Sequence, residues 1–79
     1  MVDPELIRKR ILAEMPDAQV EVADTTGGGD HFSVKVVSGA FRNLPRVQQH
    51  QRVYRALGEL MAGSAAPIHA LALQTSAPD

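Results

Sequence analysis

The sequence predicts an α+β domain of two layers, in which two helices cover one face of a three-stranded mixed sheet. Apolar residues recur at helical spacing in two segments and at alternate positions in three, in the order helix, strand, strand, helix, strand. A helical crossover joins the last two strands, so they are expected to be parallel, whereas a short loop makes the first two antiparallel. The 79 residues have room for one domain, 1–79, with 76–79 expected as a frayed tail.

The first helix is expected over residues 4–15. Asp3 suits the N-cap, and Pro4 occupies the first helical position, where its missing N–H costs nothing. Pro16 ends the segment. The apolar residues fall three and four positions apart and define the face expected to be buried: Leu6, Ile7, Ile11, Leu12 and Met15.

Two strands are expected next, over 19–24 and 31–38. In the first, Val20 and Val22 alternate with polar residues, as in a strand with one buried face. In the second, the apolar residues that alternate with polar ones are Phe32, Val34 and Val36. The loop between them contains three successive glycines, but a strand follows it instead of a helix, which argues against a phosphate-binding loop.

The second helix is expected over 46–62 and the third strand over 68–74. The residues that form the helix stripe are Val47, His50, Val53, Tyr54, Leu57, Leu60 and Met61. His50 is interpreted as a partly buried, hydrogen-bonded structural histidine of this stripe. In the third strand, Leu71 and Leu73 are expected in the core, with His69 on their side at the start of the strand.

Two histidines stand where the predicted topology brings chain segments together. His31 begins the second strand and His69 begins the third. Parallel neighbours start at the same end of a sheet and lie about 4.8 Å apart. We therefore expect the two imidazoles to converge on one small site.

The charge distribution is uneven. The net charge is −1, but residues 31–58 contain five basic side chains and no acidic one. These residues are Lys35, Arg42, Arg46, Arg52 and Arg55. Such a patch suits weak, salt-sensitive contact with DNA phosphates, an acidic protein partner, or no partner at all, as a solvated helix face.

The composition excludes several classes of protein. The chain contains no Cys, which rules out a disulfide framework, a thiol nucleophile and a self-contained thiolate metal site. It shows no nucleophile–base–orienter set and no paired carboxylates, so we expect no enzyme activity. Its apolar runs are far shorter than the roughly 20 residues of a membrane span, and no leader sequence is visible. We expect a cytoplasmic protein without membrane contact.

Three spaced segments resemble the BolA family in order and spacing. They are Phe32-Ser-Val-Lys-Val-Val-Ser-Gly-Ala-Phe41, Val47-Gln-Gln-His50-Gln-Arg-Val-Tyr54 and Ile68-His69-Ala-Leu-Ala-Leu-Gln-Thr75. The resemblance runs from the opening helix to Thr75 and implies a fold similar to type II KH domains. The sequence departs from the family where Asn43 replaces a usual Gly and where Gln49 and Gln51 flank the helix histidine. It also has no Gly-x-x-Gly loop of the kind that true KH domains use to grip RNA.

The resemblance also implies a function. Relatives share a [2Fe–2S] cluster with a monothiol glutaredoxin, which brings a Cys and a glutathione thiolate. Carried onto this sequence, the cluster ligand is His69, while His31 is either a second ligand or a structural loop residue. An imidazole can replace a thiolate on one iron, and without Cys the isolated chain would hold no cluster. The expected role is iron–sulfur trafficking or iron-status signalling; the alternative is a KH-like transcriptional regulator that binds DNA through residues 42–55.

Overall fold

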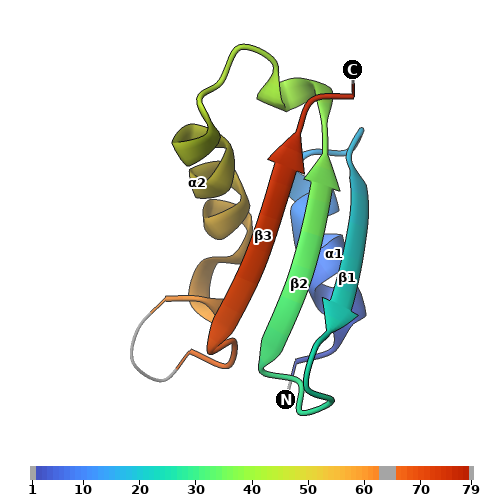
Figure 1. Cartoon of the computed structure of the whole chain (residues 1–79), viewed down its shortest axis with the longest axis vertical. Coiled ribbons are helices and arrows are strands. Elements are labelled where there is room, and N and C mark those ends of the chain that lie inside the picture. Colours follow the sequence, from blue (N-terminus) through green and yellow to red (C-terminus); the bar gives the residue numbers. More distant parts are fainter. Residues whose placement is uncertain (1, 63–65, 79) are drawn as a thin grey trace.

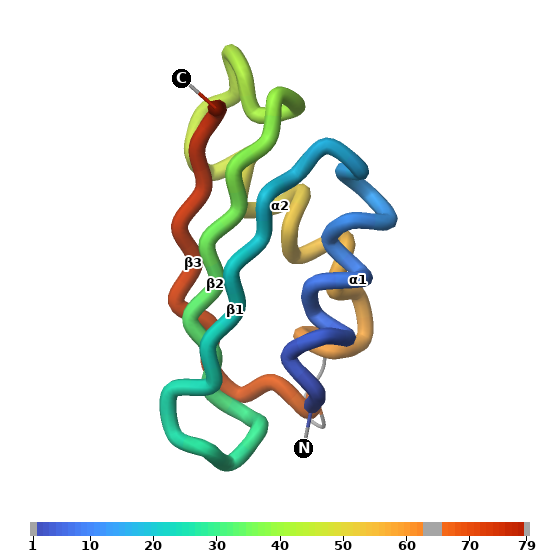
Figure 2. Tube along the Cα trace, turned by 90° about the vertical axis from the view of Figure 1, so that its right-hand side faces the viewer, coloured from blue at the N-terminus to red at the C-terminus, as the bar shows by residue number. Residues whose placement is uncertain are grey.

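The computed structural model describes residues 2–62 and 66–78. Its elements are α1 (Pro4–Glu14), β1 (Gln19–Asp24), β2 (His31–Val37), the short 3-10 helix η1 (Gly39–Phe41), α2 (Arg46–Leu57), the 3-10 helix η2 (Gly58–Leu60) and β3 (Ala70–Ser76). The strand order is β1-β2-β3, with β1 antiparallel and β3 parallel to the central β2. Both helices lie on one face of the sheet (Figures 1 and 2). The predicted fold class and topology are confirmed.

The core lies between the sheet and the two helices. Its central side chains come from alternate positions of β2 and from one face of each helix, as the periodicity predicted, although Leu6 of the predicted α1 face is 38% exposed. The most fully buried apolar residues are Ile7, Ile11, Met15, Phe32, Val34, Val36, Phe41, Val53 and Leu57. Asp3 caps α1 by accepting the N–H of Glu5, in agreement with the N-cap predicted from the sequence.

Helix α2 is shorter and less buried than its stripe predicted. It ends at Leu57 because Gly58 follows with a φ of +53°, which side-chain-bearing residues rarely adopt, and the chain continues as η2. Val47 and Tyr54 are 68% and 39% exposed, so their expected burial was wrong. The buried side of α2 is narrower than the predicted stripe and consists of Val53, Ala56 and Leu57. A helix that contacts the core along a single line does not bury every apolar side chain it carries.

Strand β3 is displaced by two residues from its predicted bounds. His69 and Ala70 both donate their N–H groups to the carbonyl oxygen of Asp30, so pairing with the sheet begins at Ala70. At the other end, Ser76 pairs with Val37, so the predicted tail of 76–79 starts one residue too early. Position 79 lies outside the described residues.

The alternation of β3 matches the prediction. Leu71 and Leu73 pack against the core as expected. His69 precedes the strand and its side chain is 65% exposed. It therefore stands at the start of β3, outside the core, against which the partly buried Leu71 and Leu73 pack.

Two polar anchors fix the end of the sheet distant from His69. The buried hydroxyl of Ser38 donates to Asp17 at 2.9 Å, and the N–H of Gly39 donates to the same carboxylate at 2.8 Å. These bonds, that of Gly39 first, hold the pKa of Asp17 below its usual value. Gln49 of α2 accepts from the Thr75 hydroxyl at 2.7 Å, which ties the helix to β3.

No helix within residues 2–62 or 66–78 has both the length and the apolar character needed to cross a membrane.

Candidate functional site

His31 and His69 meet at one end of the sheet, as the parallel pairing predicted. His31 is the first residue of β2 and pairs with Ala70, which places His69 beside the loop that enters β2. The ring centroids are 6.1 Å apart and the ring planes are nearly perpendicular, at 85°. Their side chains are 42% and 65% exposed, so both rings are accessible to a partner.

The carboxylate of Asp30 lies between the two rings. Nδ1 of His31 is 2.9 Å from Oδ1, and Nδ1 of His69 is 3.5 Å from Oδ2. The His31 contact is short but not aligned as a regular ring N–H hydrogen bond, so proximity and charge define it. The close His31 ring, followed by the charge of His69 and by Thr26, holds the pKa of Asp30 below its usual value. Asp30 thus engages the same nitrogen of both rings and leaves Nε2 of each to other partners.

The glycine-rich loop builds this arrangement. The Asp24 carboxylate accepts the N–H groups of Thr26, Gly27 and Gly29, which folds the loop back onto the end of β1. Gly27 and Gly29 have φ angles of +79° and +74°, which glycine adopts without strain. Asp30 follows the last glycine of the loop, and its carbonyl oxygen accepts the N–H groups of His69 and Ala70 at the start of β3. The three glycines therefore serve a turn and not an anion cradle.

The two imidazoles form an incomplete set of metal ligands. Imidazole nitrogen is a suitable ligand for iron, and two histidines can occupy one iron of a two-iron cluster. No group of three or more His, Cys, Asp or Glu side chains that could hold a metal occurs among the described residues. The sequence has no Cys. Any cluster held here therefore needs thiolates from another molecule, and the residues present fit such a shared site.

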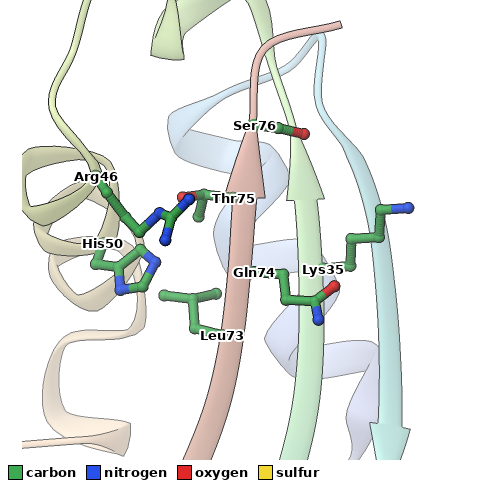
Figure 3. A pocket seen from close by; sticks show the side chains of 7 residues that line it. All are labelled: Lys35, Arg46, His50, Leu73, Gln74, Thr75 and Ser76. Atoms are coloured by element: carbon green, nitrogen blue, oxygen red, sulfur yellow. The ribbon is translucent and has the colours of Figure 1, made fainter.

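His50 lies apart from this site, on the side of α2 that faces β3 (Figure 3). Its ring is half-buried, but Nε2 is buried without a hydrogen-bond partner in residues 2–62 and 66–78. The predicted hydrogen-bonded structural role is therefore wrong for this atom. Arg46 lies four residues earlier on α2, and both side chains line a hollow beside β3.

The five predicted basic residues do not form one surface. Lys35 and Arg46 line one hollow beside β3, Arg46 from the helix side of the strand and Lys35 from the outer face of the sheet (Figure 3). Arg52 and Arg55 line a second hollow on the outer side of α2, with Leu44, Gln48 and Gln51. Arg42 follows η1 at the end of the sheet opposite His69. A nucleic acid would therefore meet two separate basic surfaces.

Two polar residues have roles beyond those the sequence indicated. Asp30 was visible as a neighbour of His31, but its contact with His69 depends on the register of β3, which periodicity does not specify. Gln49 donates to the carbonyl of Leu44 at 2.8 Å and accepts from Thr75, so it joins a loop, a helix and a strand. Its half-buried position could be inferred only from its place beside the apolar stripe.

Comparison with known proteins places the chain. Residues 8–79 match the family described as BolA-like protein. BolA-like protein 1 of Bos taurus is 46% identical over 52 residues, which are 66% of this chain and 36% of that protein. The DNA-binding transcriptional regulator BolA of Haemophilus influenzae is 43% identical over 53 residues, 67% of this chain and 48% of that protein. The chain thus matches less than half the length of these two relatives.

A solved structure agrees with this match. The structure of a bolA protein homologue from Coxiella burnetii has a TM-score of 0.75 and 33% identity, and the match covers 100% of this chain and 95% of that one. The family match begins within α1 and includes all three strands and both histidines of the candidate site. The chain therefore belongs to the BolA family.

Proposed function

We propose that this chain is an accessory protein that pairs with a monothiol glutaredoxin and shares a [2Fe–2S] cluster with it, for iron–sulfur trafficking or iron-status signalling. The observation that carries the proposal is the Asp30 carboxylate, which lies against Nδ1 of both His31 and His69. A carboxylate that engages the far nitrogen of a histidine orients the ring and raises the basicity of its ligating nitrogen. The proposed role is non-enzymatic and cytoplasmic.

The division of ligands follows from the composition. This chain contributes His69, with His31 as the second imidazole, and the glutaredoxin contributes its Cys and a glutathione thiolate. The cluster is then the cargo of a heterodimer, because this chain has no Cys to supply a thiolate and its described residues contain no group of three or more His, Asp or Glu side chains that could hold a metal. The exposure of both rings permits a partner to approach them directly.

Anaerobic reconstitution tests the proposal. The chain is mixed with a [2Fe–2S]-loaded monothiol glutaredoxin, and the product is followed by size exclusion, visible absorption and circular dichroism. We expect a one-to-one heterodimer whose spectrum shows mixed nitrogen and sulfur ligation. His69→Ala should remove that spectrum, His31→Ala should weaken it, and His50→Ala should leave it unchanged. If His50→Ala abolishes the spectrum and His69→Ala preserves it, the ligand has been assigned to the wrong element.

A second function is favoured by a separate observation. One relative is named a DNA-binding transcriptional regulator, and Arg52 and Arg55 share the outer hollow of α2 with amide side chains. Under this proposal, duplex DNA contacts that outer surface through its phosphates. Replacing both arginines by Ala should weaken binding to every sequence and flatten its salt dependence, as measured by fluorescence anisotropy. If the wild type shows no DNA binding at about 100 µM protein and low salt, this function is excluded, because the dissociation constant of non-specific DNA binding is usually lower than that concentration.

A further inference from the structure

The free edge of β3 presents unpaired backbone groups. In a parallel pair, alternate residues direct both N–H and C=O toward the neighbouring strand. The Ser38 N–H donates to the Ser76 carbonyl, and the Ala70 N–H donates to Asp30, so even-numbered residues of β3 face β2. The backbone groups of Leu71, Leu73 and Thr75 therefore point away from the sheet. No bond to these groups occurs within residues 2–62 and 66–78.

The two edges of the sheet differ in their protection. Natural edge strands avoid unwanted pairing by carrying charged side chains, proline or bulges. The outer strand β1 contains Glu21 and Asp24. Strand β3, with the sequence Ala-Leu-Ala-Leu-Gln-Thr-Ser, has neither a charged residue nor proline. The β1 edge is thus protected against pairing with a further strand, whereas the β3 edge is open to it.

A groove accompanies this open edge. A hollow of about 460 Å³ lies between α2 and β3, with Leu73 and Thr75 on the strand side (Figure 3). From the helix, Arg46 and His50 extend toward the strand. Val47 and Tyr54, both exposed, lie three and four positions from His50 and share its side of α2. The open edge therefore faces a wall that is partly apolar and partly basic.

The charges of the groove select the occupant. Its lining contains no carboxylate: Arg46 lies on the helix side of β3, Lys35 extends from the outer face of the sheet, and His50 lies in the wall beside α2 (Figure 3). A second copy of this chain paired edge to edge would bring two sets of these cations together without an acidic side chain on β3 to offset them. An extended chain with acidic side chains meets both the backbone groups and the cations.

We propose that the groove between α2 and β3 binds an extended acidic segment of a partner protein, which adds to the sheet as a fourth strand beside β3. Main-chain hydrogen bonds to Leu71, Leu73 and Thr75 supply affinity, and the pocket beside Arg46 supplies selectivity for a carboxylate. At about 3.3 Å per residue, Thr75 is roughly 20 Å along the strand from His69. The end of the groove beside Arg46 and Thr75 is therefore distant from the histidine pair, and one partner can occupy both.

A synthetic peptide tests this proposal without a cluster or a glutaredoxin. The probe is a fluorescent ten-residue peptide of alternating Val and Glu, and binding is followed by anisotropy and by amide NMR. We expect Arg46→Glu to weaken binding at least about tenfold, because it opposes a charge partner inside the groove. Arg52→Glu, the same charge change on the outer side of α2, should change binding less than about threefold. The amides of Leu71, Leu73 and Thr75 should gain exchange protection, whereas those of Ala72 and Gln74 should stay as they were.

Four results would overturn the proposal. The first is no peptide binding at 1 mM, and the second is equal loss of binding in Arg46→Glu and Arg52→Glu. The third is that a peptide interrupted by alternate prolines binds as tightly as the Val–Glu peptide, which would show attraction by charge without strand pairing. The fourth is tighter binding of single-stranded DNA to the same groove residues, which would assign the groove to nucleic acid. Because His69→Ala should leave peptide binding unchanged, failure here is distinguishable from failure of the proposed cluster function.

Discussion

Replacing Asp30 by Ala removes a carboxylate that contacts both imidazoles of the candidate site. Loss of a carboxylate behind a metal-binding histidine typically lowers metal affinity by about 10- to 100-fold. The contacts with His31 and His69, at 2.9 and 3.5 Å, are lost together, so we expect the upper part of that range. Asp30→Asn should fall between, because an amide oxygen can still accept from one ring.

The fold should survive this substitution. The bonds that fasten the start of β3 to the loop use the backbone carbonyl of Asp30, not its carboxylate. The side chain is also one-third exposed, at 33%. A loss of cluster affinity with an unchanged far-ultraviolet spectrum and unchanged urea midpoint would therefore report the site alone. Glu21→Ala removes the same charge from an exposed position of β1 and serves as the control.

The assay is a titration of the cluster-loaded monothiol glutaredoxin with each variant, followed by visible circular dichroism. Wild type and Glu21→Ala should give matching curves, with Asp30→Asn and then Asp30→Ala progressively weaker. The reasoning is refuted if Asp30→Ala titrates like the wild type while His69→Ala forms no mixed-ligand complex. In that case the ring is held by contacts other than the carboxylate.

Three further predictions concern stability. Ser38→Ala should lower the free energy of unfolding by about 1–3 kcal/mol in urea titrations, because it removes the buried hydroxyl that donates to Asp17 and accepts the N–H of Ala40; an unchanged midpoint would contradict this. Arg10 lowers the pKa of Glu59 to about 2 from 4.5, so the stability from this pair is complete above pH 4.5 and is lost toward pH 2. The difference in melting temperature between wild type and Glu59→Gln should therefore shrink over that interval, and a constant difference would refute the linkage. Gly58→Ala should cost about 1–3 kcal/mol because φ is +53°, although its Cβ would meet only Nη1 of Arg10, at an ordinary contact distance of 4.0 Å; a neutral result in thermal melts would exclude backbone strain.

Periodicity and handedness were sufficient for the topology and for the meeting of the two histidines. The alternation of Phe32, Val34 and Val36 identifies the central strand, and a right-handed crossover leaves one parallel arrangement for β3. These rules also predict that His31 and His69 share an end of the sheet. The rules of periodicity and crossover handedness use only the sequence pattern, so they do not depend on how the side chains pack in detail.

Packing and register could not be read from the same patterns. Val47 and Tyr54 fit the apolar stripe of α2 but are exposed, because burial depends on where the helix lies against the sheet. The contact between Asp30 and His69 depends on which residue of the last strand pairs first, and Asp30 fixes this through its carbonyl. The separation of Arg46 from Arg52 likewise follows from the rotation of α2 about its axis.

The crossover that joins β2 to β3 has a consequence for the order of events during folding. His31 and His69 are 38 positions apart, and β3 is the last described element of the chain. Parallel pairing of segments so distant in sequence is entropically slow, because a long loop must close before any contact is gained. The nascent chain therefore exposes single histidines until its final strand docks. Under the proposed function, the two imidazoles therefore become available as a pair only after β3 has docked.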